Sequence, residues 1–171
     1  NKALIASAGL DLARSAEHVG KTIGFEAAVA GGVPIVKAIR EGLSGSNIQQ
    51  LFGILNGTCN YILSEMRETG RDFDEVLGEA QDLGYAEADP TFDIDGVDSA
   101  HKLAILTSIA FGCEINFDSI QIEGIRHISP LDIQFASDLG YRIKLLGMAR
   151  KTEAGIQQRV HPCMVPVSAP I

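Results

Sequence analysis

The segment 97–111 is apolar almost all round after Lys102, and it constrains the fold more than any other stretch of the chain. A helix whose apolar side chains cover its whole circumference is buried, because no face of it suits water. We therefore predict a helix over 97–111 inside the molecule. The rest of the chain must supply the elements that surround it.

Helices and strands mix around this segment without a regular βαβ order. Composition, apolar spacing and bounding Gly or Pro residues predict helices over 2–19, 34–39, 58–70 and 73–83, and a short helix before residue 141. Runs rich in β-branched residues predict strands over 22–29, 48–55, 120–122, 141–146 and 157–167. We expect Thr58 to cap the helix over 58–70. We also expect a polar loop from 85 to 96, with Asp95 as the N-cap of the buried helix. The fold class is expected to be α+β, in one domain.

The composition argues against several classes of protein. The chain has 171 residues, with 14 Lys and Arg against 22 Asp and Glu, so its formal net charge is −8. Binding to nucleic acid is not expected, because it needs a cationic surface. No membrane association is expected, since no apolar run approaches the roughly 20 residues that span a bilayer and no signal peptide is recognisable. The three cysteines form no C-x-x-C pair, which fits a reducing compartment, and we expect a cytoplasmic protein.

An acidic loop precedes the buried helix. Five carboxylates lie between Glu87 and Asp98, and Lys102 follows four residues after Asp98, so the two share one helix face. One interpretation is structural, with Asp98 favoured by the helix dipole and the pair at the surface. Against it, Lys102 leads into an apolar run, where a charged side chain is costly unless it is paired. Loops of this kind also often carry function.

Metal sites and nucleophiles are less well supported by the sequence. An EF-hand register that puts Gly96 at position six puts Lys102 at position twelve, where calcium requires a glutamate. The four histidines lack metal-ligand spacing, and His101 is expected to point to a different helix face from Lys102. The cysteines are expected to occupy buried apolar positions rather than to act as nucleophiles.

The acidic loop resembles the signature of homoserine dehydrogenase. The resemblance extends over 23 positions, written Ala80-x-x-x-Gly84-Tyr85-x-Glu87-x-Asp89-Pro90-x-x-Asp93-Ile94-x-Gly96-x-Asp98-x-x-x-Lys102. Further similarity lies in 24–29, in 54–62 and in Asn1-Lys2. The resemblance implies a mixed β-sheet covered by helices on one face. It also implies interconversion of L-aspartate 4-semialdehyde and L-homoserine with NADP or NAD, in the biosynthesis of threonine, methionine and isoleucine.

The resemblance assigns roles to single residues of this chain. Lys102 matches the catalytic lysine, and reduction of an aldehyde to an alkoxide does require a proton donor or cation at that oxygen. Asp98 matches a residue that binds substrate and could also hold Lys102. Lys2 matches a lysine near substrate and nicotinamide, although a residue so close to the end of the chain could also be frayed.

Three further residues are implied to border the substrate and the cofactor. Glu87 matches the acidic residue that engages the amino-acid end of the substrate, and Gly84 borders the same pocket. Both are also expected near the cofactor. Asp93 is expected to support the substrate site, or alternatively to cap the loop. Carboxylates suit a substrate that carries an ammonium group, because a buried cation needs an opposite charge.

A monovalent cation, usually sodium, is also implied by the resemblance. The matching segment is a glycine-containing turn whose backbone carbonyls would hold the ion, and the positions carried over are Glu26, Val29, Gly31 and Val33. The alternative is a plain turn whose glycines serve only its backbone conformation.

None of the 18 glycines forms a G-x-G pair, so the phosphate-binding turn of a dinucleotide-binding domain is missing from the sequence. We therefore expect residues 1–171 to form the substrate-binding and dimerisation domain, without the nucleotide-binding domain and inactive alone. A homodimer joined through this region, with sheet edges meeting, is implied. The alternative is a non-catalytic amino-acid-binding or dimerisation module on the same fold.

Overall fold

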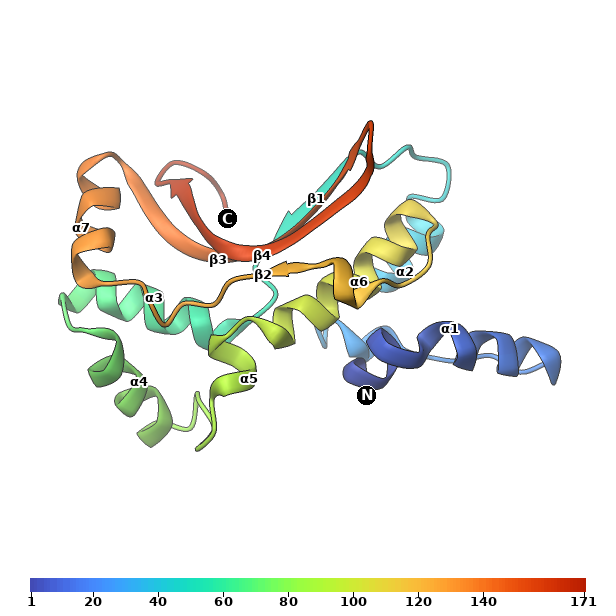
Figure 1. Ribbon diagram of the computed structural model, residues 1–171, viewed down its shortest axis with the longest axis horizontal. Helices are drawn as coiled ribbons and strands as arrows, with labels where there is room; N and C mark the ends of the chain where they lie inside the picture. The colour runs from blue at the N-terminus through green and yellow to red at the C-terminus, as the bar shows by residue number, and fades with distance from the viewer.

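The computed structural model describes residues 1–171 and is built on a curved, mixed sheet of four strands in the order β1-β3-β4-β2 (Figure 1). The strands are β1 (Gln50–Gly53), β2 (Gln121–Ile122), β3 (Tyr141–Thr152) and β4 (Gly155–Pro166). β1 and β4 both pair with β3 in antiparallel fashion, whereas β2 pairs with β4 in parallel. The expected α+β class and mixed sheet are confirmed.

The long hairpin of β3 and β4 forms the middle of the sheet. Its register runs without interruption from Tyr141 opposite Pro166 to Thr152 opposite Gly155. Residues alternate between the two faces of a strand, and Leu145 and Ala149 lie on the same face as Val160, all three fully buried. This face is the one that the helices cover.

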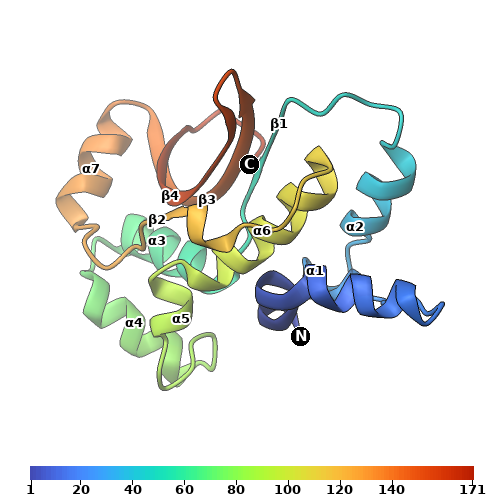
Figure 2. The ribbon, with the colours of Figure 1, turned by 45° about the vertical axis from the view of Figure 1, so that its right-hand side comes forward.

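Seven α-helices accompany the sheet. They are α1 (Lys2–His18), α2 (Ile35–Lys37), α3 (Gly57–Thr69), α4 (Phe73–Asp82), α5 (Thr91–Ile94), α6 (Val97–Phe111) and α7 (Pro130–Asp138). Short helical turns cover Glu26–Ala28, Ala38–Gly42 and Phe117–Ser119. In Figure 1, helices α3 and α6 lie below the sheet and α7 lies at one end of it. Helix α1 begins near α6 and projects outward at the end of the molecule opposite α7 (Figures 1 and 2). No helix combines the length and the apolar character needed to cross a membrane.

Helix α6 is buried as its sequence predicts. Leu103, Ala104 and Ile105 are almost completely inaccessible to solvent, and they belong to one apolar core with Ile62 of α3 and Val160 of β4. Gly147 of β3 allows a close approach here, because a Cβ at this position would lie 2.5 Å from the Leu55 side chain. The core therefore fixes the chain around residue 55 between the sheet and α6.

Several predicted elements differ from the structure. The segment 22–29 is wrong as a strand: it is extended coil followed by the turn Glu26–Ala28, because no strand of the sheet lies beside it to accept its hydrogen bonds. The expected strand 141–146 continues to Thr152. The expected polar loop 85–96 contains α5.

Two predicted helix caps are also wrong. Gly96, with φ of +85°, occupies the N-cap of α6 instead of Asp95. Asp95 is drawn away because it forms an ion pair with Arg126. Asn56, rather than Thr58, caps α3.

Candidate active site

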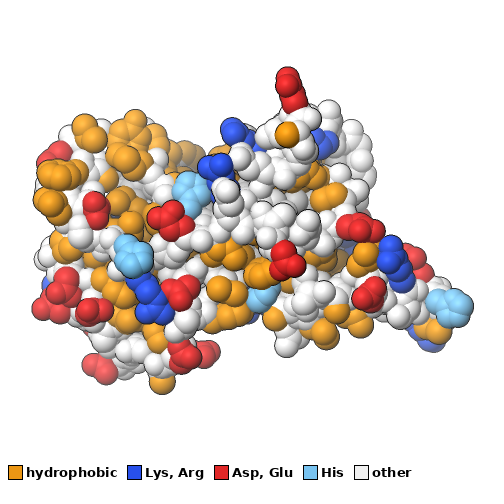
Figure 3. All heavy atoms as spheres, in the orientation of Figure 1, with side chains coloured by type: hydrophobic (Ala, Val, Ile, Leu, Met, Phe, Trp, Pro, Cys, Tyr) orange, Lys and Arg blue, Asp and Glu red, His pale blue; other side chains and the backbone are white.

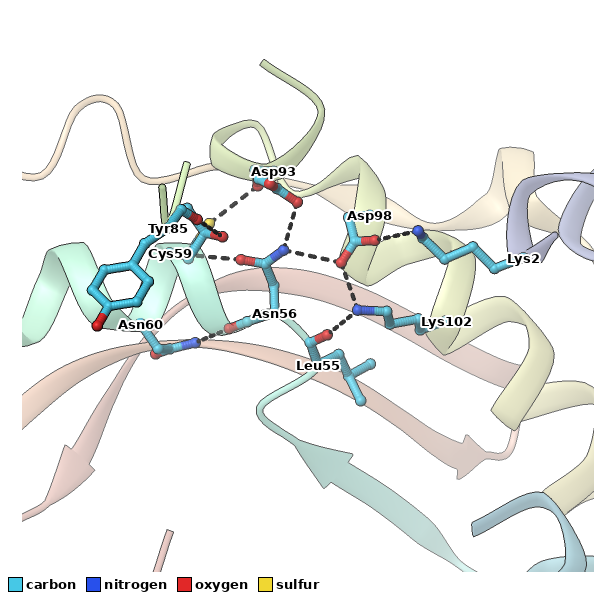
Figure 4. Close-up of polar contacts among 10 residues, drawn as sticks. Lys2, Leu55, Asn56, Cys59, Asn60, Tyr85, Asp93, Asp98 and Lys102 are labelled. Carbon is cyan, nitrogen blue, oxygen red and sulfur yellow. Dashed lines mark hydrogen bonds and ion pairs between the residues drawn. The ribbon is translucent and has the colours of Figure 1, made fainter. Parts of the chain in front are cut away.

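Asp98, in the first turn of α6, is the centre of a polar cluster (Figure 4). One carboxylate oxygen lies 3.0 Å from the ammonium of Lys2. The other lies 2.7 Å from Nζ of Lys102 and accepts a hydrogen bond of 2.9 Å from the side-chain amide of Asn56. Because its side chain is only 5 % exposed, the carboxylate depends on these three donors in place of water.

Lys102 is fixed by two acceptors. Its Nζ contacts Asp98 and donates a hydrogen bond of 2.6 Å to the backbone carbonyl of Leu55, just before α3. The four-residue spacing on α6 does bring the two charges onto one face, as predicted. The Lys102 side chain is 20 % exposed and that of Asp98 is 5 % exposed, so this is a largely buried pair. The surface-pair interpretation is wrong.

Lys2 joins the cluster from α1 and is not frayed. Its ammonium contacts Asp98 and lies 5.7 Å from the centre of the Phe92 ring. A cation above an aromatic face is attracted by the ring quadrupole. The first turn of α1 therefore lies against the start of α6, although these residues are almost 100 positions apart in the sequence.

Asn56 and Asp93 complete the cluster on its α5 side. The amide nitrogen of Asn56 donates to Asp98 and, at 2.7 Å, to Asp93. The amide oxygen accepts from the backbone N–H of Cys59 and so caps α3. Sequence reasoning missed Asn56. Its place directly before a predicted helix was the available signal, because Asn is a preferred N-cap residue.

Charge and burial shift the pKa values of these groups. Burial acts to raise the pKa of Asp98, but hydrogen bonds from Lys102, Asn56 and Lys2 outweigh it and hold the pKa below its usual value. Burial together with the nearby carboxylates raises the pKa of the Cys59 thiol to about 12, so this cysteine is no thiolate nucleophile. Burial and the charge of Lys2 lower the pKa of His101, which stacks on Phe117.

A hollow of about 740 Å³ opens beside the two lysines. Lys2 and Lys102 lie on one side of it, and the segment from Ile23 to Ala28, together with Ala30 and Gly31, forms much of the remainder. A cation that faces a hollow and is held by a buried carboxylate can donate a proton to, or stabilise negative charge on, an oxygen bound there. The cluster thus has the parts needed for acid–base chemistry on a small polar molecule.

Gly84 and Glu87 lie on the loop between α4 and α5, apart from the hydrogen bonds around Asp98. Gly84 adopts a left-handed conformation with φ of +77° and ends the α4 turn. Gln81 donates to the backbone carbonyl of Glu87, whose side chain remains exposed. The backbone here is therefore fixed, while the carboxylate of Glu87 faces solvent.

The glycine-containing turn after residue 25 is compact. The carboxylate of Glu26 accepts hydrogen bonds of 3.0 Å from the backbone N–H groups of Val36 and Lys37, at the start of α2. Ala30, with φ of +48°, and Gly32, with φ of +88°, turn the backbone sharply, and Val29 is fully buried. No group of three or more His, Cys, Asp or Glu side chains is arranged to hold a metal ion.

Comparison with models of protein families gives a match to this chain. The family model for homoserine dehydrogenase matches residues 34–171. The chain belongs to the homoserine dehydrogenase family. Its acidic loop, α6 and the whole sheet lie within the matched residues. Asp98, Lys102, Asn56 and Asp93 therefore belong to the part of the fold that the family model covers, whereas Lys2 lies before it.

Individual homoserine dehydrogenases are similar over nearly the whole chain. The enzyme of Pseudomonas aeruginosa is 59 % identical over 166 residues, which are 97 % of this chain and 38 % of that protein. The enzyme of Neisseria gonorrhoeae is 55 % identical over 98 % of this chain and 39 % of its own length. The chain therefore spans well under half the length of these relatives.

Solved structures agree with the fold. A homoserine dehydrogenase from Thiobacillus denitrificans superposes with a TM-score of 0.98 at 55 % identity, covering 99 % of this chain and 39 % of that one. A hyperthermophilic archaeal homoserine dehydrogenase in complex with NADPH has a TM-score of 0.83 at 30 % identity, covering 99 % and 48 %. The family resemblance expected from the acidic loop is therefore confirmed, and the relatives that share it are oxidoreductases.

Proposed function

We propose that residues 1–171 form the substrate-binding and proton-transfer domain of an enzyme that interconverts L-aspartate 4-semialdehyde and L-homoserine with NAD(P). The observation that carries the proposal is the convergence of Lys102, Asp98 and Lys2 beside the hollow. The family membership adds support. Because the chain spans 38 % of a relative's length, we expect turnover only when this domain is combined with a nucleotide-binding domain. We expect the enzyme to act in the cytoplasm.

The proposed chemistry centres on the aldehyde oxygen. A bound nicotinamide cofactor would supply or accept the hydride at the reacting carbon. In the reducing direction Lys102 would donate its proton to the oxygen, and in the oxidising direction it would accept the proton of the hydroxyl, because Lys102 borders the hollow and is more exposed than Asp98, its partner in the ion pair. Asp98, a carboxylate held ionised by its donors, would keep the Lys102 side chain in place. Lys2 would border both substrate and nicotinamide.

The amino-acid end of the substrate needs a negative partner. Asp93 lies beside the cluster and contacts Asn56, and the exposed carboxylate of Glu87 is free to bind an ammonium group. We assign both to the substrate, with Gly84 bordering its amino-acid end. None of these three residues lines the hollow beside the two lysines, so the amino-acid end would extend from that hollow toward the loop. Glu87 and Gly84 would also border the nicotinamide together with Lys2, since an exposed loop is open to a domain that docks against it.

A monovalent cation such as sodium is proposed for the turn after residue 25. The donors would be the backbone carbonyl oxygens of Glu26, Val29, Gly31 and Val33. The residues fit a hard cation, because carbonyl oxygens suit such ions. The carbonyls of Glu26 and Val33 accept backbone hydrogen bonds from Val29 and Ile35, and each retains a second lone pair. The ion would stiffen the wall of the hollow that faces the two lysines.

A homodimer is also proposed. Leu131, Phe135 and Leu139 recur every four residues along α7 and are 59 %, 57 % and 69 % exposed. Figure 3 shows apolar side chains gathered over this helix. Phe52 and Ile54, on and beside the edge strand β1, are exposed as well. Exposed apolar side chains on a helix face and at a sheet edge are more stable when another protein surface covers them, and we propose that a second copy of this chain does so.

The test of the proposed reaction is Lys102→Ala in a protein that joins this chain to its nucleotide-binding domain. Loss of the proton donor is expected to lower kcat roughly 10²–10⁴-fold, with a much smaller change in KM, because the contact matters most as charge develops on oxygen. Oxidation of NADPH with aspartate semialdehyde measures both constants.

Lys151→Ala is the matched control, since Lys151 lies on the distant tip of β3 and contacts Asn47. Its kinetics are expected to equal those of the wild type. An unchanged kcat in Lys102→Ala would remove Lys102 from the proton-donor role, and the absence of any turnover in the joined wild-type protein would refute the proposed reaction.

A further inference from the structure

Asn56 performs two tasks with one amide group. Its oxygen accepts a hydrogen bond of 2.8 Å from the Cys59 N–H, which caps α3. This contact fixes the orientation of the amide, so its nitrogen must face the opposite way, where it donates to Asp93 and Asp98. Both N–H bonds and the oxygen are engaged, and the residue is only 5 % exposed.

The cap alone does not require asparagine. Asp, Ser and Asn are about equally good N-cap residues, because each offers an oxygen to the backbone N–H groups of the first turn. Of these three, Asn alone presents two N–H donors on the same rigid group. Asn56 therefore offers something beyond helix stability, and both of its donors are directed at carboxylates.

The two carboxylates are brought close by this amide. One oxygen of Asp93 and one of Asp98 lie 2.7 Å and 2.9 Å from the same nitrogen. Two carboxylates this close to one nitrogen repel each other, and the repulsion favours protonation of one of them unless a donor lies between them. The charged or titratable groups that face Asp98 come from four helices: Lys2 of α1, Cys59 of α3, Asp93 of α5, and His101 and Lys102 of α6.

We propose that Asn56 is a positioning residue of the active site, which keeps Asp98 ionised and directed at Lys102 while Asp93 stays beside it. The inference rests on the proposed function for its kinetic consequence, because Asp98 holds the proton donor. When Asp98 is protonated it no longer pairs with Lys102. Activity then falls on the acid side of the pH profile, at a pH that Asn56 helps to set.

The test is Asn56→Asp in the protein joined to its nucleotide-binding domain. The substitution keeps the size and the cap but replaces two donors with a third negative charge. We expect kcat to fall at least tenfold with KM changed less. We also expect the acid limb of the pH profile to move up by roughly one pH unit or more, since like charges raise carboxyl pKa values. Asn56→Ser keeps the cap without adding charge, and the acid limb of its pH profile should move less than that of Asn56→Asp.

The matched control is Asn116→Asp. Asn116 also caps a helical turn with its side-chain oxygen, through Ser119, but contacts no carboxylate. Its kinetics and pH profile should equal those of the wild type. If Asn56→Asp retains the wild-type kcat and acid limb, the positioning role is wrong.

A second measurement separates this inference from the proposed reaction. In the 171-residue chain, the side-chain carboxyl carbon of Asp98 can be titrated by NMR, with circular dichroism to establish folding. Asn56→Asp is expected to raise the Asp98 pKa at unchanged helix content. An unchanged pKa overturns the inference even if the enzyme is active, and a raised pKa supports it even if the joined protein acts on another substrate.

Discussion

Asp98 connects three helices at the level of a single side chain. Lys2, Lys102 and Asn56 hold its pKa below the usual value although burial acts in the opposite direction. A carboxyl group whose pKa is lower in the folded than in the unfolded chain stabilises the fold. For Asp98 this contribution is fully present at pH values above the unfolded pKa of 3.8. This contribution is lost as the pH falls through the folded pKa. Stability at acid pH therefore reports on the cluster.

Asp98→Asn tests this dependence. The variant is expected to be less stable at pH 7 by roughly 1–3 kcal/mol, because hydrogen bonds to a charged group are lost. The difference from the wild type should shrink as the pH falls from 3.8, where the carboxyl of the unfolded chain takes up its proton, through the lower pKa of the folded protein. Urea unfolding between pH 7 and pH 2.5 measures both. A difference that does not depend on pH would contradict the ionised state assigned to Asp98.

Residue patterns predicted part of this cluster. The four-residue spacing of Asp98 and Lys102 was visible because helical geometry turns spacing into contact. Lys2, Asn56 and the carbonyl of Leu55 come from segments about 40 to 100 positions away, and no local period encodes such contacts. The roles of Lys2, Glu87 and Asp93 rested on the resemblance alone. For Glu87 this was necessary, since its exposed side chain makes no local pattern.

At the scale of elements, the turn between α5 and α6 holds Asp93 and Asp98 in place, and the chain after β2 packs against this turn. Ile125 donates a backbone hydrogen bond of 2.9 Å to the carbonyl of Ile94. A Cβ on Gly124 would lie 2.2 Å from that same carbonyl oxygen. The backbone at Ile94 and the backbone at Gly124 cannot move apart without displacing the turn. Only glycine at position 124 therefore allows the two segments to come this close.

Gly124→Ala should therefore destabilise the protein by roughly 1–3 kcal/mol through overpacking and lower kcat by displacing the α5–α6 turn. Gly78→Ala is the control, since Gly78 lies within α4 with no atom near its missing Cβ. Alanine there should stabilise the helix by up to about 1 kcal/mol. Thermal unfolding of both variants gives the comparison. Equal effects of the two substitutions would show that the tight approach at Gly124 has no energetic consequence.

Elements were predictable where their signal was local. α6 was predicted with its observed ends, since the segment is apolar almost all round after Lys102 and a glycine stands at each end of it. The segment 22–29 has the composition of a strand, but a strand also needs a neighbour, and the sheet places none beside it. Asp95 failed as a cap because Arg126, 31 residues away, competes for its carboxylate. Such competition lies outside any local window.

At the scale of the whole molecule, the sheet is covered by helices on one face, and α7 carries an apolar stripe that nothing in the chain covers (Figures 1 and 3). The charge of −8 keeps most of the surface hydrated, so exposed Leu131, Phe135 and Leu139 stand out as a contact surface. If a second copy covers them, both copies bury the same stripe, since a two-fold interface uses one surface twice. A single charge on the stripe then enters the interface twice.

Phe135→Glu should therefore convert a dimer of this chain into a monomer, which light scattering coupled to size-exclusion chromatography measures as a halving of mass. Val19→Glu is the control: Val19 is 63 % exposed at the end of α1, remote from α7, and its variant should remain dimeric. Helical content by circular dichroism should be equal in all three proteins, because the Phe135 side chain is 57 % exposed. A Phe135→Glu protein that stays dimeric would place the interface elsewhere, with Phe52 at the β1 edge as the next position to substitute.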